Sequence, residues 1–201
     1  MSTDILVDVG ELRRVVGAMY CQVAEEPERE FHFPTGRAWA ADLGYEPALL
    51  ARVPEGAVES FAGVANPFSL GRLEPGETVV DLGCGAGTDL LMAAQMVGPT
   101  GRVIGIDMTP AMAVKARANA AAMGARNVEV LEGLVERLPL PDGAADVVIS
   151  NGVIDLVPDK DAVFAEILRV LRPGGRIQIA DVTLERPVSE GARRDIDLWA
   201  Q

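Results

Sequence analysis

Cysteine, histidine and basic side chains are scarce in this sequence. Its 201 residues include two cysteines and one histidine, too few for a disulfide framework or a zinc site, so we expect no metal. The 18 lysines and arginines are outnumbered by 30 aspartates and glutamates, which gives a formal net charge of -12. That charge repels nucleic acid and anionic membranes, so we expect neither partner. We expect a small-molecule substrate, neutral or cationic; the alternative is that the acidity serves solubility alone.

Long apolar runs are also absent. No stretch of 18 apolar residues predicts a transmembrane helix, and the first residues lack the basic segment of a signal peptide. We therefore expect a cytoplasmic protein, in which Cys21 and Cys84 stay reduced. The length suits one domain with a sizeable core.

The most informative stretch is a glycine-rich turn at residues 79–87, VVDLGCGAG. Apolar residues run into a turn with glycine at every second position, and a helical pattern follows in residues 88–94, TDLLMAA. This order of strand, turn and helix is typical of the first unit of a nucleotide-binding parallel sheet. The glycines allow positive φ angles and a close approach of the backbone to a ligand. The alternative is a plain tight turn.

The spacing of these glycines distinguishes between cofactors. A dinucleotide fingerprint reads G-x-G-x-x-G and binds a pyrophosphate, whereas here Asp81 stands two residues before Gly83. An acid at that position suits a cation better than a diphosphate. S-adenosylmethionine carries a sulfonium and an ammonium group and no phosphate, and the stretch resembles motif I of the class I methyltransferases that use it. We expect this cofactor, and its product S-adenosylhomocysteine, to contact Asp81, Gly83, Cys84 and Gly85.

A second acid comes at the end of the next predicted strand. Asp107 lies 24 residues after Gly83, where an acid in such sheets accepts hydrogen bonds from the ribose hydroxyls. The alternative is an acid placed at a helix N-terminus. We predict that Asp107 and its neighbour Met108 belong to the cofactor site.

Two further segments follow the third and fourth predicted strands. We predict that Leu134 and Val135 contact the adenine ring and that Glu136 accepts a hydrogen bond from its amino group; the alternative for Glu136 is a solvated loop acid. Asn151 ends the fourth strand, and a buried asparagine needs partners. We predict that it contacts the methionine end of the cofactor, and the alternative is a turn asparagine that bonds its own backbone.

From residue 78 onward, strands alternate with helices. This alternation predicts an α/β fold with a parallel sheet and right-handed crossovers. The resemblance implies a Rossmann-like sheet of strand order 3-2-1-4-5. We expect strands at Thr78–Leu82, Arg102–Asp107, Val128–Glu132, 146–150 and 176–182. We expect helices at 87–97, Pro110–Met123 and 160–171, with Thr109 as an N-cap, a turn at 172–175 and a last helix near Val188.

The first third of the chain reads differently. Residues 10–26 have the apolar spacing of an amphipathic helix, and shorter helices are predicted at 37–44, 47–52 and 55–63, before a loop at 66–71. None of these segments reads as a strand. We therefore predict a helical cap or lid in residues 1–72 and a cofactor-binding core in residues 73–201.

Several segments narrow the resemblance to the arsenite methyltransferase branch of class I. They are SFAGVANP at 60–67, GIDMTP at 105–110, GLVE at 133–136, SNGVIDLVPDK at 150–160 and LRPGG at 171–175. The similarity extends over about residues 55 to 199, and the segment at 150–160 is its most specific part. It implies transfer of a methyl group to a small-molecule acceptor.

The sequence departs from that branch in two respects. Arsenite enzymes bind trivalent arsenic through cysteine thiolates, and one of these follows the asparagine of the fourth strand, where this chain has Gly152. Another lies beyond the segment that resembles 195–199, DIDLW. We therefore expect an acceptor other than arsenite. Class I sheets also continue with two more strands, which this sequence does not show. We expect the N-terminal helices, a second copy, an exchanged segment or a partner to cover the fifth strand, and the alternative is a truncated chain.

Methyl transfer needs a general base only if the acceptor must lose a proton. His32, between Phe31 and Phe33, is the candidate, and the alternative is a structural histidine. Tyr20, Asp155 and Asn66 are further candidates. A second hypothesis is a cofactor-binding partner or regulatory subunit without catalysis. A third is a nicotinamide oxidoreductase, which Asp81 and the glycine spacing disfavour.

Overall fold

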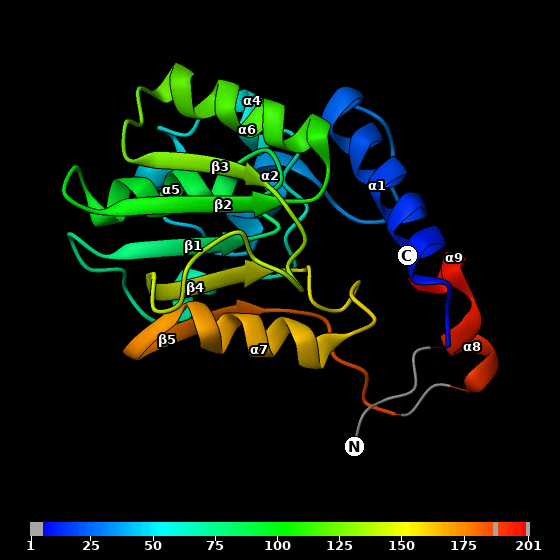
Figure 1. Cartoon of the computed structure of the whole chain (residues 1–201). Helices are drawn as coiled ribbons and strands as arrows, with labels where there is room; N and C mark the ends of the chain where they lie inside the picture. Colours follow the sequence, from blue (N-terminus) through cyan, green and yellow to red (C-terminus); the bar gives the residue numbers. More distant parts are fainter. Residues whose placement is uncertain (1–5, 187–188, 200–201) are drawn as a thin grey trace.

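The computed structural model describes residues 6–186 and 189–199 and is built on a five-stranded parallel sheet of order β3-β2-β1-β4-β5 (Figure 1). The predicted strand order is confirmed. The strands are β1 (Thr78–Leu82), β2 (Arg102–Asp107), β3 (Val128–Glu132), β4 (Ala145–Asn151) and β5 (Leu171–Ala180). Among the described residues, no helix is both long and apolar enough to cross a membrane.

The two faces of the sheet are covered by different helices. Side chains alternate along a strand, so Val79 packs with α5 (Thr88–Val97) and α6 (Pro110–Met123), whereas Val80 packs with α7 (Lys160–Val170). Because both faces are covered, the central strands are apolar throughout rather than alternating. The position of each central strand is therefore marked in the sequence by its apolar run.

The cap helices α2 (Gly36–Asp42), α3 (Pro47–Leu50) and α4 (Glu55–Val58) share one apolar cluster with Leu91 and Met92 of α5 and Ala120 of α6. The helix predicted at 55–63 ends early, because the backbone beyond it bonds to α2. The carbonyl of Phe61 accepts a hydrogen bond from Gly36 N at 2.9 Å, and that of Gly63 accepts one from Trp39 Nε1 at 2.7 Å. The loop predicted at 66–71 contains a short 3-10 helix, η1 (Pro67–Leu70).

Helix α1 (Val9–Glu25) confirms the predicted amphipathic helix, and it lies beside the carboxyl ends of the strands with α8 (Glu190–Arg194) and α9 (Ile196–Trp199) (Figure 1). Its buried Leu12 and Val16 pack in one cluster with Ile196 and Trp199. The last helix was predicted near Val188, which lies outside the described residues.

Strand β5 begins five residues earlier than predicted. Ala145 pairs with Leu171 and Val147 with Arg176, so the predicted turn at 172–175 is a bulge inside the strand. Proline lacks the N–H that a ladder requires, and Gly174 has a φ of 82°, which a bulge tolerates. Since no other strand pairs with β5 among the described residues, its second edge is open.

Candidate cofactor site

A pocket of about 130 Å³ lies where the carboxyl ends of β1, β2 and β4 meet. The structure brings all ten predicted cofactor residues to its wall, namely Asp81, Gly83, Cys84, Gly85, Asp107, Met108, Leu134, Val135, Glu136 and Asn151. These residues come from four separate loops of the chain. The position matches the crevice in which open parallel sheets bind ligands.

The glycine turn is tightly constrained at Gly83. This residue has a φ of 64°, and an added Cβ would overlap Val153 Cγ2 and lie 2.8 Å from Val153 Cγ1. Any side chain therefore combines backbone strain with a steric clash. The next residue, Cys84, donates its backbone N–H to the Ile106 carbonyl at 3.0 Å, which fixes the turn against β2.

Asp107 connects the turn with the end of β2. Its Oδ2 accepts a hydrogen bond from Gly85 N at 2.8 Å, and its Oδ1 accepts one from Thr109 N at 2.8 Å. Thr109 occupies the predicted N-cap position of α6, but its own side chain makes no capping bond. Each carboxylate oxygen of Asp107 has a second lone pair, so this side chain braces the loop and is still able to accept ribose hydroxyls.

Two further carboxyl groups, those of Asp81 and Asp89, lie in the pocket wall. Burial, reinforced by the charge of Asp89, raises the pKa of Asp81 well above its usual range. Asp81 is 2% exposed, and its Oδ2 has no hydrogen-bond partner among the described residues. An unpartnered buried carboxyl oxygen facing a pocket indicates a missing polar or cationic ligand.

Asn151 makes contacts that neither sequence hypothesis included. Its Oδ1 accepts hydrogen bonds from Val64 N at 2.8 Å and Ala65 N at 3.3 Å, and its Nδ2 donates to the Ala65 carbonyl at 2.8 Å. The side chain therefore joins the end of β4 to the segment that enters the core. Its contact with the methionine end of a cofactor stays a prediction.

Helix α1 closes the pocket over the predicted adenine segment. Arg13 Nη2 lies 2.9 Å from Glu136 Oε1, so the loop acid is paired with the helix rather than solvated. Leu12, Val16 and Tyr20 add an apolar wall. Sequence reasoning missed this role of α1, because the apolar spacing of a helix defines its buried face without saying what that face covers.

Of the four candidate bases, one lines the pocket. His32 is exposed, has its ring centroid 4.7 Å from that of Phe33, and does not line the pocket. Tyr20 does line it, and burial together with the charge of Asp155 raises the pKa of its phenol. Asn66 and Asp155 lie outside the lining.

Asp155 faces a second carboxylate at the end of β5. Burial, followed by the charge of Asp181, raises the pKa of Asp155 to about 7, while Lys160 opposes the shift. Since the folded protein holds this proton more tightly than the unfolded chain, whose aspartate pKa is roughly 3.9, stability falls as the pH rises between these values. Asp155→Asn is therefore expected to raise the midpoint of thermal unfolding at pH 8.5 and to leave it nearly unchanged at pH 4.5.

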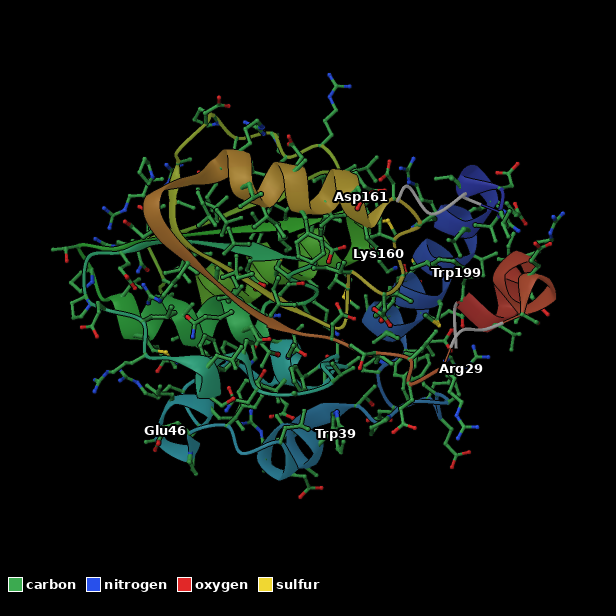
Figure 2. The ribbon with its side chains drawn as sticks, turned by 90° about the horizontal axis from the view of Figure 1, so that it is seen from below. Arg29, Trp39, Glu46, Lys160, Asp161 and Trp199 are labelled. Atoms are coloured by element: carbon green, nitrogen blue, oxygen red, sulfur yellow. The ribbon has the colours of Figure 1, made fainter. Side chains whose placement is uncertain are left out.

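The matched control for this prediction is Asp161→Asn, which removes an exposed carboxylate from the first turn of α7 (Figure 2). This variant is expected to gain no stability at either pH. An equal effect of Asp155→Asn at pH 4.5 and pH 8.5 contradicts the prediction.

The sheet order, the glycine turn and the acid at the end of β2 define a Rossmann-like nucleoside-binding domain. Within that class, residues 73–199 match the methyltransferase domain family, and the chain belongs to it. S-adenosylmethionine is the cofactor of its methyltransferase relatives, so the expected family and cofactor are confirmed.

Among the relatives is an arsenite methyltransferase of Halobacterium salinarum, 48% identical over 77% of this chain and 39% of its own length. A nocamycin O-methyltransferase of Saccharothrix syringae is 43% identical over 51% of this chain and 37% of its own. The crystal structure of an arsenic(III) S-adenosylmethionine methyltransferase from Chlamydomonas reinhardtii superposes with a TM-score of 0.67 at 39% identity, covering 72% of this chain and 51% of that one. The chain thus spans about half or less of the length of these relatives.

Proposed function

We propose that this chain binds S-adenosylmethionine in the pocket and transfers its methyl group to a small-molecule acceptor. The observation that carries the proposal is the meeting of all ten predicted residues in one pocket whose acidic side chains outnumber its basic ones. In this arrangement, Asp107 receives the ribose and residues 134–136 receive the adenine. The cationic end of the cofactor then lies toward the buried acids Asp81 and Asp89.

The bound cofactor supplies an activated methyl group on a sulfonium. The chain therefore has to hold the acceptor in line with that group and exclude water. The apolar wall of α1, formed by Leu12, Val16 and Tyr20, serves both purposes. No base is assigned, because His32 lies outside the pocket.

The acceptor proposed here does not depend on thiolate ligands. Gly152 has a φ of 67°, and an added Cβ would lie 3.1 Å from Val64 Cγ1, so a cysteine at this position is disfavoured. Cys84 is buried in the cofactor turn, and Cys21 on α1 does not line the pocket. The acidic lining favours a neutral or cationic small molecule over an anion, in agreement with the net charge.

Calorimetric titration with S-adenosylmethionine and S-adenosylhomocysteine, followed by methyl-transfer assays on amine, hydroxyl, thiol and arsenite acceptors, tests the proposal. Micromolar binding with turnover of an acceptor supports it. Binding without turnover of any acceptor class favours the non-catalytic alternative. Binding of NADH but not of S-adenosylmethionine overturns it in favour of an oxidoreductase.

The salt bridge from α1 makes a separate prediction about cofactor entry. The ion pair between Arg13 and Glu136 joins α1 to the loop on the opposite side of the pocket, so a shift of α1 widens the way in for a cofactor. Arg13→Ala removes the ion pair with Glu136 and is expected to raise the association rate constant for S-adenosylhomocysteine about fivefold, which corresponds to about 1 kcal/mol for one partly exposed pair. Stopped-flow fluorescence measures this rate.

The control is Arg14→Ala, which removes the neighbouring exposed pair with Glu11 on the same helix. It is expected to leave the association rate unchanged. A similar acceleration in both variants shows that general loosening of α1, and not loss of the Arg13–Glu136 ion pair, controls cofactor entry.

The proposal also includes the organisation of the whole protein. Residues 1–72 act as the helical cap and lid, and residues 73–201 act as the cofactor-binding core. The open edge of β5 is proposed to be covered by a second copy or by a partner, and the cytoplasm is the proposed location.

A further inference from the structure

Tyr45 is a cap residue whose hydroxyl reaches the wall of the cofactor pocket. It is 2% exposed, and its ring packs edge-on against Phe61 and Phe68, with centroid distances of 5.3 and 6.1 Å. Its Oη donates a hydrogen bond to Asp89 Oδ1 at 2.6 Å. Burial and the charge of Asp89 raise the pKa of the Tyr45 phenol, so the hydroxyl keeps its proton and acts as a donor.

Asn151 completes a closed triangle with these two side chains. Its Nδ2 lies 3.0 Å from both Asp89 Oδ2 and Tyr45 Oη, and it shares its two hydrogens among these atoms and the Ala65 carbonyl at 2.8 Å. Each carboxylate oxygen of Asp89 therefore has one donor within hydrogen-bond distance and keeps a further lone pair. The triangle fixes the orientation of Asp89 in the first turn of α5, where its side chain lines the pocket.

Asp89 and Asp81 differ in the side chains that donate hydrogen bonds to them. Burial raises the pKa of Asp89 to about 6, and the bonds from Tyr45 and Asn151 oppose that shift, whereas Asp81 has no side-chain donor among the described residues. Asp89 is thus the carboxylate that two side-chain donors hold in one orientation, and these donors favour its ionised form. Of the described lining residues, the cationic one is Arg13, and Glu136 already neutralises it. The charge of Asp89 is left for a cationic ligand group.

We propose that Tyr45 is a positioning residue of the cofactor site, which holds Asp89 as an oriented carboxylate that binds the ammonium group of S-adenosylmethionine. The inference rests on the proposed function, because it assumes that this cofactor occupies the pocket. Tyr45 itself does not line the pocket and acts through Asp89.

The test uses Tyr45→Phe, which keeps the ring packing and removes only the hydroxyl. Dissociation constants are measured by calorimetry for S-adenosylmethionine, S-adenosylhomocysteine and 5′-methylthioadenosine, which lacks the amino-acid part. The first two ligands are expected to bind about tenfold more weakly, the size expected for one hydrogen bond to a buried charged group. Binding of 5′-methylthioadenosine is expected to stay unchanged, a selectivity that a merely structural role does not produce.

Asp89→Asn is the second variant, and it is expected to show the same selectivity even if Tyr45→Phe proves too unstable to titrate. Gln178→Met is the matched control, since it removes buried cap-to-sheet hydrogen bonds, to the carbonyls of Gly71 and Pro67, outside the pocket. It is expected to lower stability without changing any affinity. Equal weakening of all three ligands, or of none, overturns the inference while the proposed function stands. Failure of the unmodified protein to bind S-adenosylmethionine overturns both.

Discussion

Asp107→Ala is expected to weaken binding of S-adenosylmethionine at least 100-fold. The wild-type carboxylate is 7% exposed and is held by Gly85 N and Thr109 N, so we expect it to accept the ribose hydroxyls without reorganising. Two hydrogen bonds to a charged acceptor contribute about 1.5–3 kcal/mol each, and both are lost with the carboxylate. The loss of its bonds to the loop adds to the effect. Calorimetric titration measures the change.

Two further variants help to interpret the result for Asp107→Ala. Asp107→Asn keeps an acceptor for Thr109 N and is expected to fall between Asp107→Ala and the wild type. Glu132→Ala removes an exposed acid at the end of the neighbouring strand β3, where it pairs with Arg117 at 3.1 Å, and is expected to leave the affinity unchanged. Wild-type affinity in Asp107→Ala contradicts the proposed ribose contact.

Gly83→Ala is expected to destabilise the fold by about 2–5 kcal/mol and to abolish cofactor binding. About 1–2 kcal/mol comes from a side chain at a φ of 64°, and about 1–3 kcal/mol comes from forcing Val153 out of the way. Because Val153 also lines the pocket, its displacement deforms the site directly. Denaturant unfolding measures the stability, and titration measures the affinity.

The neighbouring glycine separates the two causes. Gly85 has a φ of 53°, and no atom lies within 4 Å of a Cβ added there. Gly85→Ala is therefore expected to destabilise the fold only by the backbone cost of about 1–2 kcal/mol. In the double variant Gly83→Ala with Val153→Ala, the clash is relieved and part of the stability returns. Equal losses in the two single variants would show that steric overlap with Val153 contributes nothing.

Strand positions could be predicted from the sequence better than the ends of elements that depend on distant contacts. β1 and β2 lie where apolar runs placed them, because strands covered on both faces leave a continuous pattern, and the edge strand β3 was located by its position in the alternation of strands and helices. The early end of α4 and the early start of β5 depend on contacts between distant residues, such as Gly36 N with the Phe61 carbonyl and Ala145 with Leu171. Local sequence carries no signal for such partners.

The residues of the candidate site likewise include some that the sequence predicts and some that it does not. Residues at or just beyond the carboxyl ends of strands, such as Asp81, Asp107 and Glu136, were predictable because parallel strands bring these ends to one edge of the sheet. The contribution of α1 was not, since Arg13 reaches Glu136 across 123 positions of the chain. The triangle of Tyr45, Asp89 and Asn151 likewise unites three distant segments.

The packing of α1 against α9 separates access to the pocket from the integrity of the sheet. Leu12 and Val16 share a cluster with Ile196 and Trp199, and none of these residues pairs with a strand. Parting the two helices therefore leaves the strand ladders intact, and it breaks this apolar cluster, which includes Leu156, and the contact of Lys160 with the Trp199 ring. Such an opening is local, so its free energy depends on a few side chains of α1 and α9, whereas the buried strands set the global free energy of unfolding.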